Sequence, residues 1–172
     1  MNSPKAPWTI SVQTNRGVFC LLVTPKGLYE VRFPGRTSQR GQAFTDCLSP
    51  LLRPMTDRVW SKVRGMFAAY FRNPAAKVNL KLDLSTCTEF EKDVYRALRR
   101  VPAGKVLRYG ELAKRAGYPG AARAVGNAMK KNRLPIVIPC HRVVPAGGGI
   151  GQYSAGVRWK RFLLEHESFN VR

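Results

Sequence analysis

Acidic residues are scarce in this chain. Its 172 residues include 10 Asp and Glu against 30 Lys and Arg, which gives a net charge of +20 and an isoelectric point near 10.7. Residues 1–84 hold 13 basic and 4 acidic side chains and residues 85–172 hold 17 and 6, so the excess is no basic tail on a neutral domain. Such a charge favours nucleic acid as the partner, because displaced counterions supply most of the non-specific affinity. A merely solubilising surface is the alternative.

Long apolar runs are also lacking. No run approaches the ~18 residues of a membrane span, and the first residues contain no apolar core of a signal peptide. No amphipathic helix is both basic and strongly apolar on one face, which argues against an anionic membrane as partner. With 44% hydrophobic residues the chain can still form a core. We expect a soluble protein of the cytoplasm, associated with the nucleoid, or of the nucleus in a eukaryote.

Residues that bind metals are few and scattered. The chain has four cysteines, none in a C-x-x-C pair, and two histidines: Cys20, Cys47, Cys87, Cys140, His141 and His166. A zinc site would have to gather distant thiols with almost no imidazole, so we expect no metal and no other cofactor. Disulfides are not expected in a chain of this size without an export signal. The cysteines are then buried thiols, or one of them is reactive.

The first half predicts a small sheet with a packed helix. Short runs rich in β-branched and aromatic residues predict strands at residues 9–14, 17–23 and 27–33. A basic loop at residues 34–42 follows, and residues 78–84 alternate as a fourth strand. A helix begins at Thr56 or Asp57, and its aromatic stripe is expected to be core: Trp60, Val63, Phe67, Tyr70 and Phe71.

The composition changes near Ser85, which predicts two domains, residues 1–84 and 85–172, in an α/β (α+β) protein. Thr88 and Glu91 form a capping box for a helix that ends before Pro102. Helices at residues 109–116 and 121–131 surround a Gly-containing turn, a pattern typical of a helix-turn-helix. A last helix covers residues 157–166. The second half is therefore predicted to be mainly helical.

The helix after the turn has one long side chain, Arg123, in its first half. Its neighbours are small: Ala121, Ala122, Ala124 and Gly126. A helix that reads base edges in the major groove usually presents several long polar groups. A smooth helix with one arginine can press into the minor groove and insert that arginine where a base has left the stack. Close helix packing with a solvated Arg123 is the alternative, and these residues alone do not decide. Lys130 and Lys131 suit phosphate contacts or a solvated helix end.

Cys140 and His141 follow an apolar run, residues 136–138, which predicts the end of a buried strand. A thiolate is the nucleophilic form of cysteine, and a neighbouring base lowers its pKa. Glu165 and Glu167 in the last helix are candidates to orient such a base. Adjacent residues of a strand point to opposite faces, so direct pairing needs a turn, or a bridging water. A buried structural cysteine is the alternative.

Several segments together resemble one family. They are residues 90–94, 106–112, 121–129, 138–144 (IPCHRVV) and 151–165. In order and spacing they are similar to the O6-alkylguanine-DNA alkyltransferases, also called methylated-DNA–protein-cysteine methyltransferases. The resemblance covers about half of the chain strongly. In the first half it rests only on the pattern of strands followed by a helix, and it implies a ribonuclease-H-like domain there.

The resemblance implies DNA repair by direct reversal. Such a protein flips O6-alkylguanine, or O4-alkylthymine, out of duplex DNA by way of the minor groove and moves the alkyl group irreversibly to its own cysteine. Carried onto this chain, Cys140 is the acceptor, His141 the base through a water, and Glu165 its orienting partner. Tyr109 helps to rotate the nucleotide and donates to guanine N3, and Arg123 fills the gap. The implied pocket comprises Asn132, Pro135, Val143, Tyr153, Ser154 and Ala155.

Two departures and three rival interpretations remain. Some family members bind zinc in the first domain, but here that half has two cysteines and no histidine, so we expect none. Ala155 stands where many members have Gly, which leaves acceptance of bulky adducts open.

The rivals are a non-enzymatic lesion sensor, a helix-turn-helix regulator and a cysteine hydrolase. The presence of Cys140 argues against the sensor. We expect a monomer, with cooperative binding on DNA left open.

Overall fold

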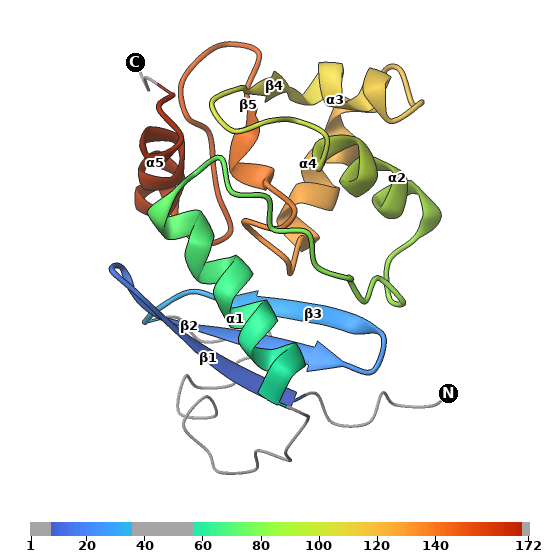
Figure 1. The fold of residues 1–172 in the computed structure, drawn as a ribbon. Helices are drawn as coiled ribbons and strands as arrows, with labels where there is room; N and C mark the ends of the chain where they lie inside the picture. The colour runs from blue at the N-terminus through green and yellow to red at the C-terminus, as the bar shows by residue number, and fades with distance from the viewer. Residues whose placement is uncertain (1–7, 36–56, 170–172) are drawn as a thin grey trace. The chain divides into compact units, whose positions relative to one another are not determined.

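The structure, a computed structural model, describes residues 8–35 and 57–169, without the side chains of residues 57–60. The chain divides into two compact units, Met1–Leu84 and Ser85–Arg172 (Figure 1). Most of the predicted basic loop, together with Cys47, lies outside the described residues, and so does the side chain of Trp60. No helix in the described part of the chain is both long and apolar enough to span a membrane.

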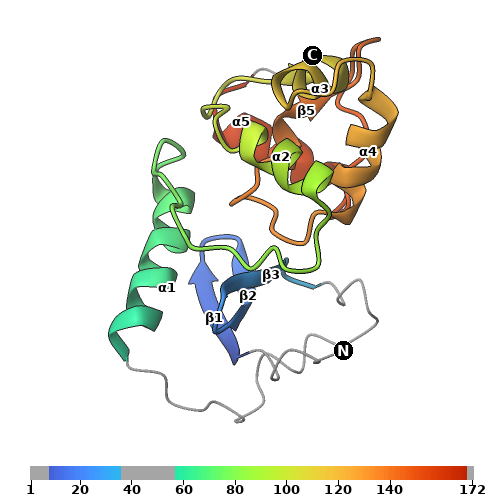
Figure 2. The same ribbon diagram turned by 90° about the vertical axis from the view of Figure 1, so that its right-hand side faces the viewer.

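The first unit is an antiparallel sheet with one helix, as predicted. Its strands β1 (Trp8–Thr14), β2 (Gly17–Thr24) and β3 (Gly27–Arg32) follow in sequence order. Two-residue turns join them, and Gly17 and Gly27 adopt positive φ after those turns. The helix α1 (Asp57–Arg72) packs along β1 (Figure 2).

Of the aromatic stripe predicted on α1, Phe67, Tyr70 and Phe71 are core as expected, whereas Val63 is only half-buried. The Phe19 ring from β2 lies 5.4 Å from that of Phe67 and 4.9 Å from that of Phe71, measured between centroids. All three side chains are buried. Contacts of this kind stabilise aromatic pairs beyond their area burial.

The predicted strand at residues 78–84 is wrong. This segment makes one isolated bridge, from Leu82 to Leu28, in which Leu28 N donates to Lys81 O and Asp83 N donates to Leu28 O, both at 2.8 Å. The segment pairs with β3 only at Leu28, near the start of that strand, so the two segments form no ladder of backbone hydrogen bonds. Asp83 is buried and accepts a hydrogen bond from Thr24 at 2.6 Å.

The second unit is mainly helical and confirms the predicted α/β class. It contains α2 (Glu89–Leu98), β4 (Leu107–Arg108), α3 (Tyr109–Arg115), α4 (Ala122–Lys131), the 3₁₀ turn η2 (Cys140–Arg142), β5 (Val143–Val144) and α5 (Val157–His166). The capping box at Thr88 is present, with both reciprocal hydrogen bonds to Glu91. Helices α3 and α4 pack together as the predicted helix-turn-helix.

The predicted strand end at residues 136–138 is wrong. These residues form a buried turn, in which Ile138 N donates to Leu134 O at 2.8 Å and Ile136 has φ of 74°. Positive φ is costly for a β-branched residue and persists only where its surroundings hold it. Here side-chain hydrogen bonds from Asn132 replace those that a strand neighbour would supply, and the chain reaches Cys140 through a turn.

Candidate active site

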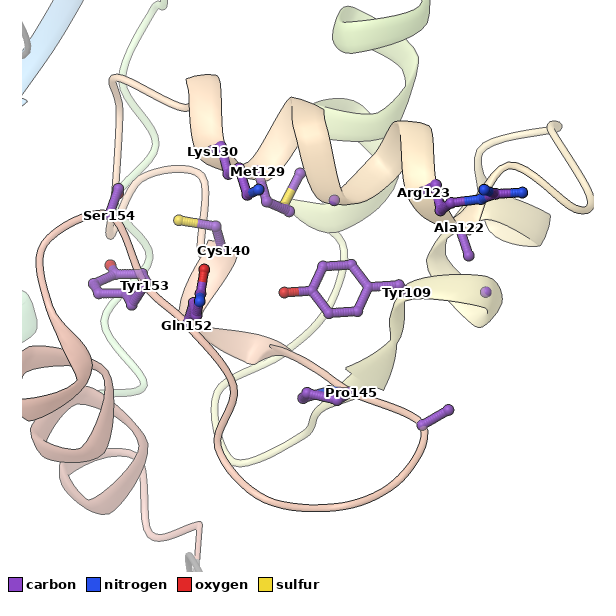
Figure 3. Close-up of a pocket in the computed structure, with 13 residues that line it drawn as sticks. Tyr109, Ala122, Arg123, Met129, Lys130, Cys140, Pro145, Gln152, Tyr153 and Ser154 are labelled. Atoms are coloured by element: carbon purple, nitrogen blue, oxygen red, sulfur yellow. The ribbon is translucent and has the colours of Figure 1, made fainter.

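A cleft of about 780 Å³ opens in the second unit (Figure 3). It lies between the helix-turn-helix and the chain that leads into α5. Its lining residues are Tyr109, Gly110, Ala122, Arg123, Gly126, Met129, Lys130, Cys140, Pro145, Ala146, Gln152, Tyr153 and Ser154. A cleft of this size, largely apolar with a few polar groups, can hold a nucleobase.

Cys140 is the first residue of η2 and lies in the wall of the cleft, with an exposed fraction of 4%. Burial raises the pKa of its thiol, while hydrogen bonding from the Asn132 amide and the charge of Lys160 act in the opposite direction. The thiol is therefore shielded from water but surrounded by groups that favour the thiolate. Burial has the largest effect, so the pKa of Cys140 lies above its ordinary value and the thiol keeps its proton until a base removes it.

Asn132 ties the end of α4 to the cysteine. Its Nδ2 donates to Ile138 O and to Cys140 Sγ, both at 3.0 Å, and its Oδ1 accepts from Leu134 N at 2.9 Å. The side chain is 2% exposed. All three bonds are shielded from water, so this one amide fixes the position of the thiol relative to the helix-turn-helix.

Glu167, and not Glu165, is the partner of His141. The fully buried His141 places Nε2 at 2.9 Å from Glu167 Oε1. Arg142 donates to both oxygens of the same carboxylate, through Nη2 at 2.7 Å and Nε at 2.8 Å. Glu165 is exposed on the opposite side of α5. The assignment of Glu165 as orienting residue is therefore wrong: the buried face of α5 carries Leu163, Leu164 and Glu167.

This carboxylate is ionised over a wide pH range. Burial alone would raise the pKa of Glu167, but hydrogen bonds and charges from His141 and Arg142 lower it to about 2. Arg142 also donates from Nη1 to Val101 O, just beyond α2. Arg142, together with the Glu167 carboxylate, therefore links η2, α5 and the end of α2 through buried, charge-assisted hydrogen bonds.

The two ring nitrogens of His141 have different surroundings. The ionised Glu167 accepts from Nε2–H, so Nδ1 is left as the unprotonated nitrogen. Nδ1 is buried and has no hydrogen-bond partner within the described residues. Burial lowers the pKa of His141 although Glu167 opposes this, which keeps the ring neutral. Although the chain turns at η2, no direct hydrogen bond joins His141 to the Cys140 thiol among the described residues.

Lys160 was missed by the sequence analysis. Its side chain is fully buried in α5, and Nζ donates to Val143 O at 2.7 Å and to Gln152 O at 3.5 Å. Burial lowers its pKa to about 8, while the nearby Cys140 acts to raise it. Its position in the sequence could have indicated its burial, because Lys160 stands three residues before Leu163 and so lies on the apolar face of α5.

Tyr109 and Arg123 lie on the helix-turn-helix side of the cleft. The Tyr109 hydroxyl points toward Cys140 across the cleft, whereas Arg123 extends away from it (Figure 3). Burial raises the pKa of Tyr109, and Cys140 adds to this, so the hydroxyl keeps its proton. Of the predicted DNA-contacting residues, four line the cleft: Ala122, Arg123, Gly126 and Lys130.

Three other predicted DNA-contacting residues lie off the cleft. Ala121 precedes α4, and Ala124 is exposed on it. Lys131 pairs with Glu91 at 3.0 Å and remains largely exposed. Ala124 and Lys131 belong to the same helix as Arg123 and Ala121 adjoins its first residue, so a partner lying along α4 can reach them.

The predicted pocket residues separate into two groups. Tyr153 and Ser154 line the cleft. Four others are buried behind its wall instead: Asn132, Pro135, Val143 and Ala155. Asn132 acts on Cys140 through its amide, and the Val143 carbonyl accepts from Lys160. The methyl group of Ala155 therefore takes no space from the cleft.

No group of three or more metal-ligating side chains gathers within residues 8–35 and 57–169. Cys20 is disulfide-bonded, so the expectation that the chain has no disulfide is wrong, and Cys87 and Cys140 are free. Cys87 is half-buried, and burial raises its pKa while Arg133 opposes this.

Comparison with known proteins agrees with this geometry. Residues 89–169 match the model of the 6-O-methylguanine DNA methyltransferase, DNA binding domain. The chain is 43% identical over 102 residues to the methylated-DNA–protein-cysteine methyltransferase of Salmonella typhimurium, a match that covers 59% of this chain and 60% of that protein. A relative of the same name from Mycobacterium leprae is 41% identical over 119 residues, with 65% and 72% covered.

Solved structures match over nearly the whole chain. An O6-methylguanine methyltransferase from Mycobacterium tuberculosis is 31% identical, with a TM-score of 0.75 and 94% of this chain and 92% of that chain covered. OGT from the same organism, solved in complex with DNA, is 33% identical with a TM-score of 0.73, and the match covers 91% and 90%. Fold and site define a helix-turn-helix protein with a buried cysteine in its cleft. The chain belongs to the 6-O-methylguanine DNA methyltransferase family.

Proposed function

We propose that this protein repairs DNA by direct reversal, transferring the alkyl group of O6-alkylguanine, and of O4-alkylthymine, from duplex DNA to its own Cys140. The observation that carries the proposal is the free, buried Cys140 thiol, held by Asn132 in the wall of a cleft beside a helix-turn-helix. Family membership and the DNA complex of the Mycobacterium tuberculosis OGT support it. Its site of action would be the nucleoid in the cytoplasm, or the nucleus in a eukaryote.

In the transfer step the Cys140 sulfur attacks the alkyl carbon attached to guanine O6. The S–C bond forms as the C–O bond breaks, and the base keeps the electron pair. His141 Nδ1 takes the thiol proton, through a water, and Glu167 stabilises the resulting imidazolium. The Tyr109 hydroxyl donates to guanine N3 and stabilises the charge that develops on the leaving base. His141 then returns this proton to the released guanine, so the net reaction moves the alkyl group to sulfur and the thiol proton to guanine.

The product is a thioether, which no group in the site can cleave. Displacement at an sp³ carbon needs a strong nucleophile, and a thioether sulfur is a poor leaving group. One transfer therefore consumes the protein, which acts as a stoichiometric reagent and needs no cofactor.

The target atom lies within the base stack, so the nucleotide must be flipped out first. The small residues of α4 allow this helix to approach the minor groove closely, and Arg123 at the rim of the cleft fills the space that the base leaves. Lys130 and Lys131 contact phosphates. The charge of +20 provides the non-specific attraction.

Two alternatives use the same DNA-binding helix. A lesion sensor would bind alkylated DNA without transfer, and a helix-turn-helix regulator would prefer a DNA sequence over a lesion. The small residues of α4 count against base reading in the major groove. Alkyl transfer uses the buried His141–Glu167 pair to remove the thiol proton, whereas a lesion sensor does not need such a pair.

The test is the intact mass of the protein after incubation with a duplex that carries one O6-methylguanine, followed by peptide mapping. We expect a single methyl group on Cys140, saturating at one per protein. Cys140→Ala should abolish transfer and keep DNA binding, whereas Cys87→Ala, which removes the other free cysteine of the described residues, should retain transfer. Transfer by the Cys140→Ala variant, or tight binding of the lesion without any mass change, would refute the proposal.

A further inference from the structure

The turn of the helix-turn-helix, residues 116–121, consists of small residues, one proline and Tyr118. Gly117 and Gly120 adopt positive φ, 89° and 84°, and a Cβ added at either would meet nothing within 4 Å. Glycines in such open positions give the backbone a wide choice of conformations. Tyr118 is the only residue of the turn with a polar side chain, so no other side chain of the turn can hold it by a hydrogen bond.

The start of α4 depends on this turn. The Tyr118 N–H donates to Ala113 O at 2.9 Å beside the end of α3, and the Tyr118 carbonyl accepts from Ala121 N at 3.2 Å just before α4. Ala121 has no side chain that could cap the first N–H groups of the helix. Arg123 is the second residue of α4, so its position follows that of the turn.

The Tyr118 side chain joins the turn to α2. Its hydroxyl donates to Asp93 Oδ2 at 2.8 Å, and its ring lies edge-on against the Phe90 ring, with 4.8 Å between the centroids. Arg96 donates to Oδ1 of the same carboxylate. Phe90, Asp93 and Arg96 all belong to α2. Because its acceptor is charged, the hydroxyl bond is stronger than one between neutral groups.

Helix α2 is a firm support for the turn. Val94 and Leu98 are fully buried on its inner face, and the helix packs against both α3 and α4 (Figure 2). The Tyr95 hydroxyl donates to Ala128 O at 2.9 Å and so fixes the second half of α4 on α2. The first half of α4 is joined to the same support by way of the turn.

We propose that Tyr118 and Asp93 are positioning residues for Arg123. By joining the turn to α2 they hold the first half of α4 in the place from which Arg123 enters the stack beside the flipped nucleotide. The inference rests on the proposed function and names what keeps the arginine in place. Neither Tyr118 nor Asp93 lines the cleft that holds Cys140, so their effect should be confined to duplex substrates.

Tyr118→Phe tests the proposal with little disturbance, because it removes the hydroxyl and keeps the ring against Phe90. Single-turnover rates of methyl transfer are measured with a duplex that carries O6-methylguanine and with the free O6-methylguanine base. We expect the duplex rate to fall by about fivefold, the factor that corresponds to the net contribution of one ordinary hydrogen bond. The free-base rate should stay unchanged, whereas a general loss of structure would lower both rates.

The dependence on Arg123 is tested by combining two substitutions. If Tyr118 acts through Arg123, adding Tyr118→Phe to Arg123→Ala should lower the duplex rate no further, so that the two losses do not add. Additive losses would mean that Tyr118 acts by another route and would overturn the proposal.

Asp93→Ala should reproduce the loss on the duplex, and Asp93→Asn, which keeps an oxygen that can accept from Tyr118, should recover part of it. Glu89→Ala is the matched control and should keep the duplex rate. Glu89 pairs with Lys92, three residues further along α2, as Asp93 pairs with Arg96, but within the described residues it accepts no hydrogen bond from the turn. Both alanine variants remove one negative charge, so a difference between them reports on the turn and not on the attraction for DNA.

The possible failures are distinguishable. An unchanged duplex rate in Tyr118→Phe, equal losses on duplex and free base, or equal effects of Asp93→Ala and Glu89→Ala overturns the positioning role and leaves the proposed function standing. Absence of transfer by the unaltered protein overturns the proposed function, and the positioning role with it.

Discussion

Replacing Glu167 with Gln should destabilise the second unit, whereas Glu165→Gln, two residues earlier on the same helix, should not. The pKa of Glu167 is lowered from 4.5 to about 2 in the folded protein, and this shift corresponds to about 3 kcal/mol of stability at neutral pH. Removing one partner of a buried ion pair costs a similar amount, because Arg142 would remain buried without its counter-charge. Glu165 is exposed, so its loss should be almost neutral.

The same shift predicts a pH dependence. Because the folded pKa lies below the unfolded one, the contribution is complete above the unfolded value of about 4.5 and is lost as the pH falls toward 2. The Gln variant should lack this acid-sensitive component, and its stability should change less than that of the unaltered protein over this range.

Hydrogen exchange followed by mass spectrometry is the suitable assay, because it resolves the two units of the chain and reports local opening free energies. Peptides that cover η2 and α5 should lose protection in Glu167→Gln and keep it in Glu165→Gln. Equal effects of the two substitutions, or a loss below about 1 kcal/mol in Glu167→Gln, would refute the assignment of the buried pair, because a removed partner should cost more.

Three further substitutions test the site. Arg123→Ala should slow transfer from duplex DNA more than transfer from free O6-alkylguanine base, because its proposed role is to fill the gap in the stack; equal losses on both substrates would contradict this. Tyr109→Phe should lower the single-turnover transfer rate by about 100-fold, as expected for loss of a donor to a developing charge, with DNA affinity retained in a binding assay. Lys160→Met removes a cation near Cys140 and so raises the pKa of the thiol, which should shift the pH–rate profile of transfer to higher pH; an unchanged profile would show that Lys160 acts only through its hydrogen bonds to Val143 O and Gln152 O.

The interactions that the sequence predicts correctly are short-range ones. The capping box of Thr88 and Glu91 and the two helices of the helix-turn-helix depend on residues within a few positions of one another. The same holds for the first three strands, whose two-residue turns join adjacent segments. Cys140 is prominent because it stands in the IPCHRVV segment, which needs no knowledge of distant contacts.

The errors all involve contacts that the local pattern of residues does not show. The apolar run at residues 136–138 suits a strand, but no strand within residues 8–35 and 57–169 pairs with it, and the Asn132 amide holds it in a turn instead. Residues 78–84 alternate as a strand should, yet meet the sheet at one bridge.

Glu165 and Glu167 are equally plausible partners for a histidine as long as only the sequence is considered. Helical spacing places Glu167 with Leu163 on one face, but the tertiary fold decides that this face meets His141 and Arg142. The sequence alone therefore determined the local elements, the candidate acceptor cysteine and the charge that favours DNA. Only the tertiary structure decided which buried charges are neutralised and which residues line the cleft, because burial and pairing depend on segments that the chain brings together over long distances.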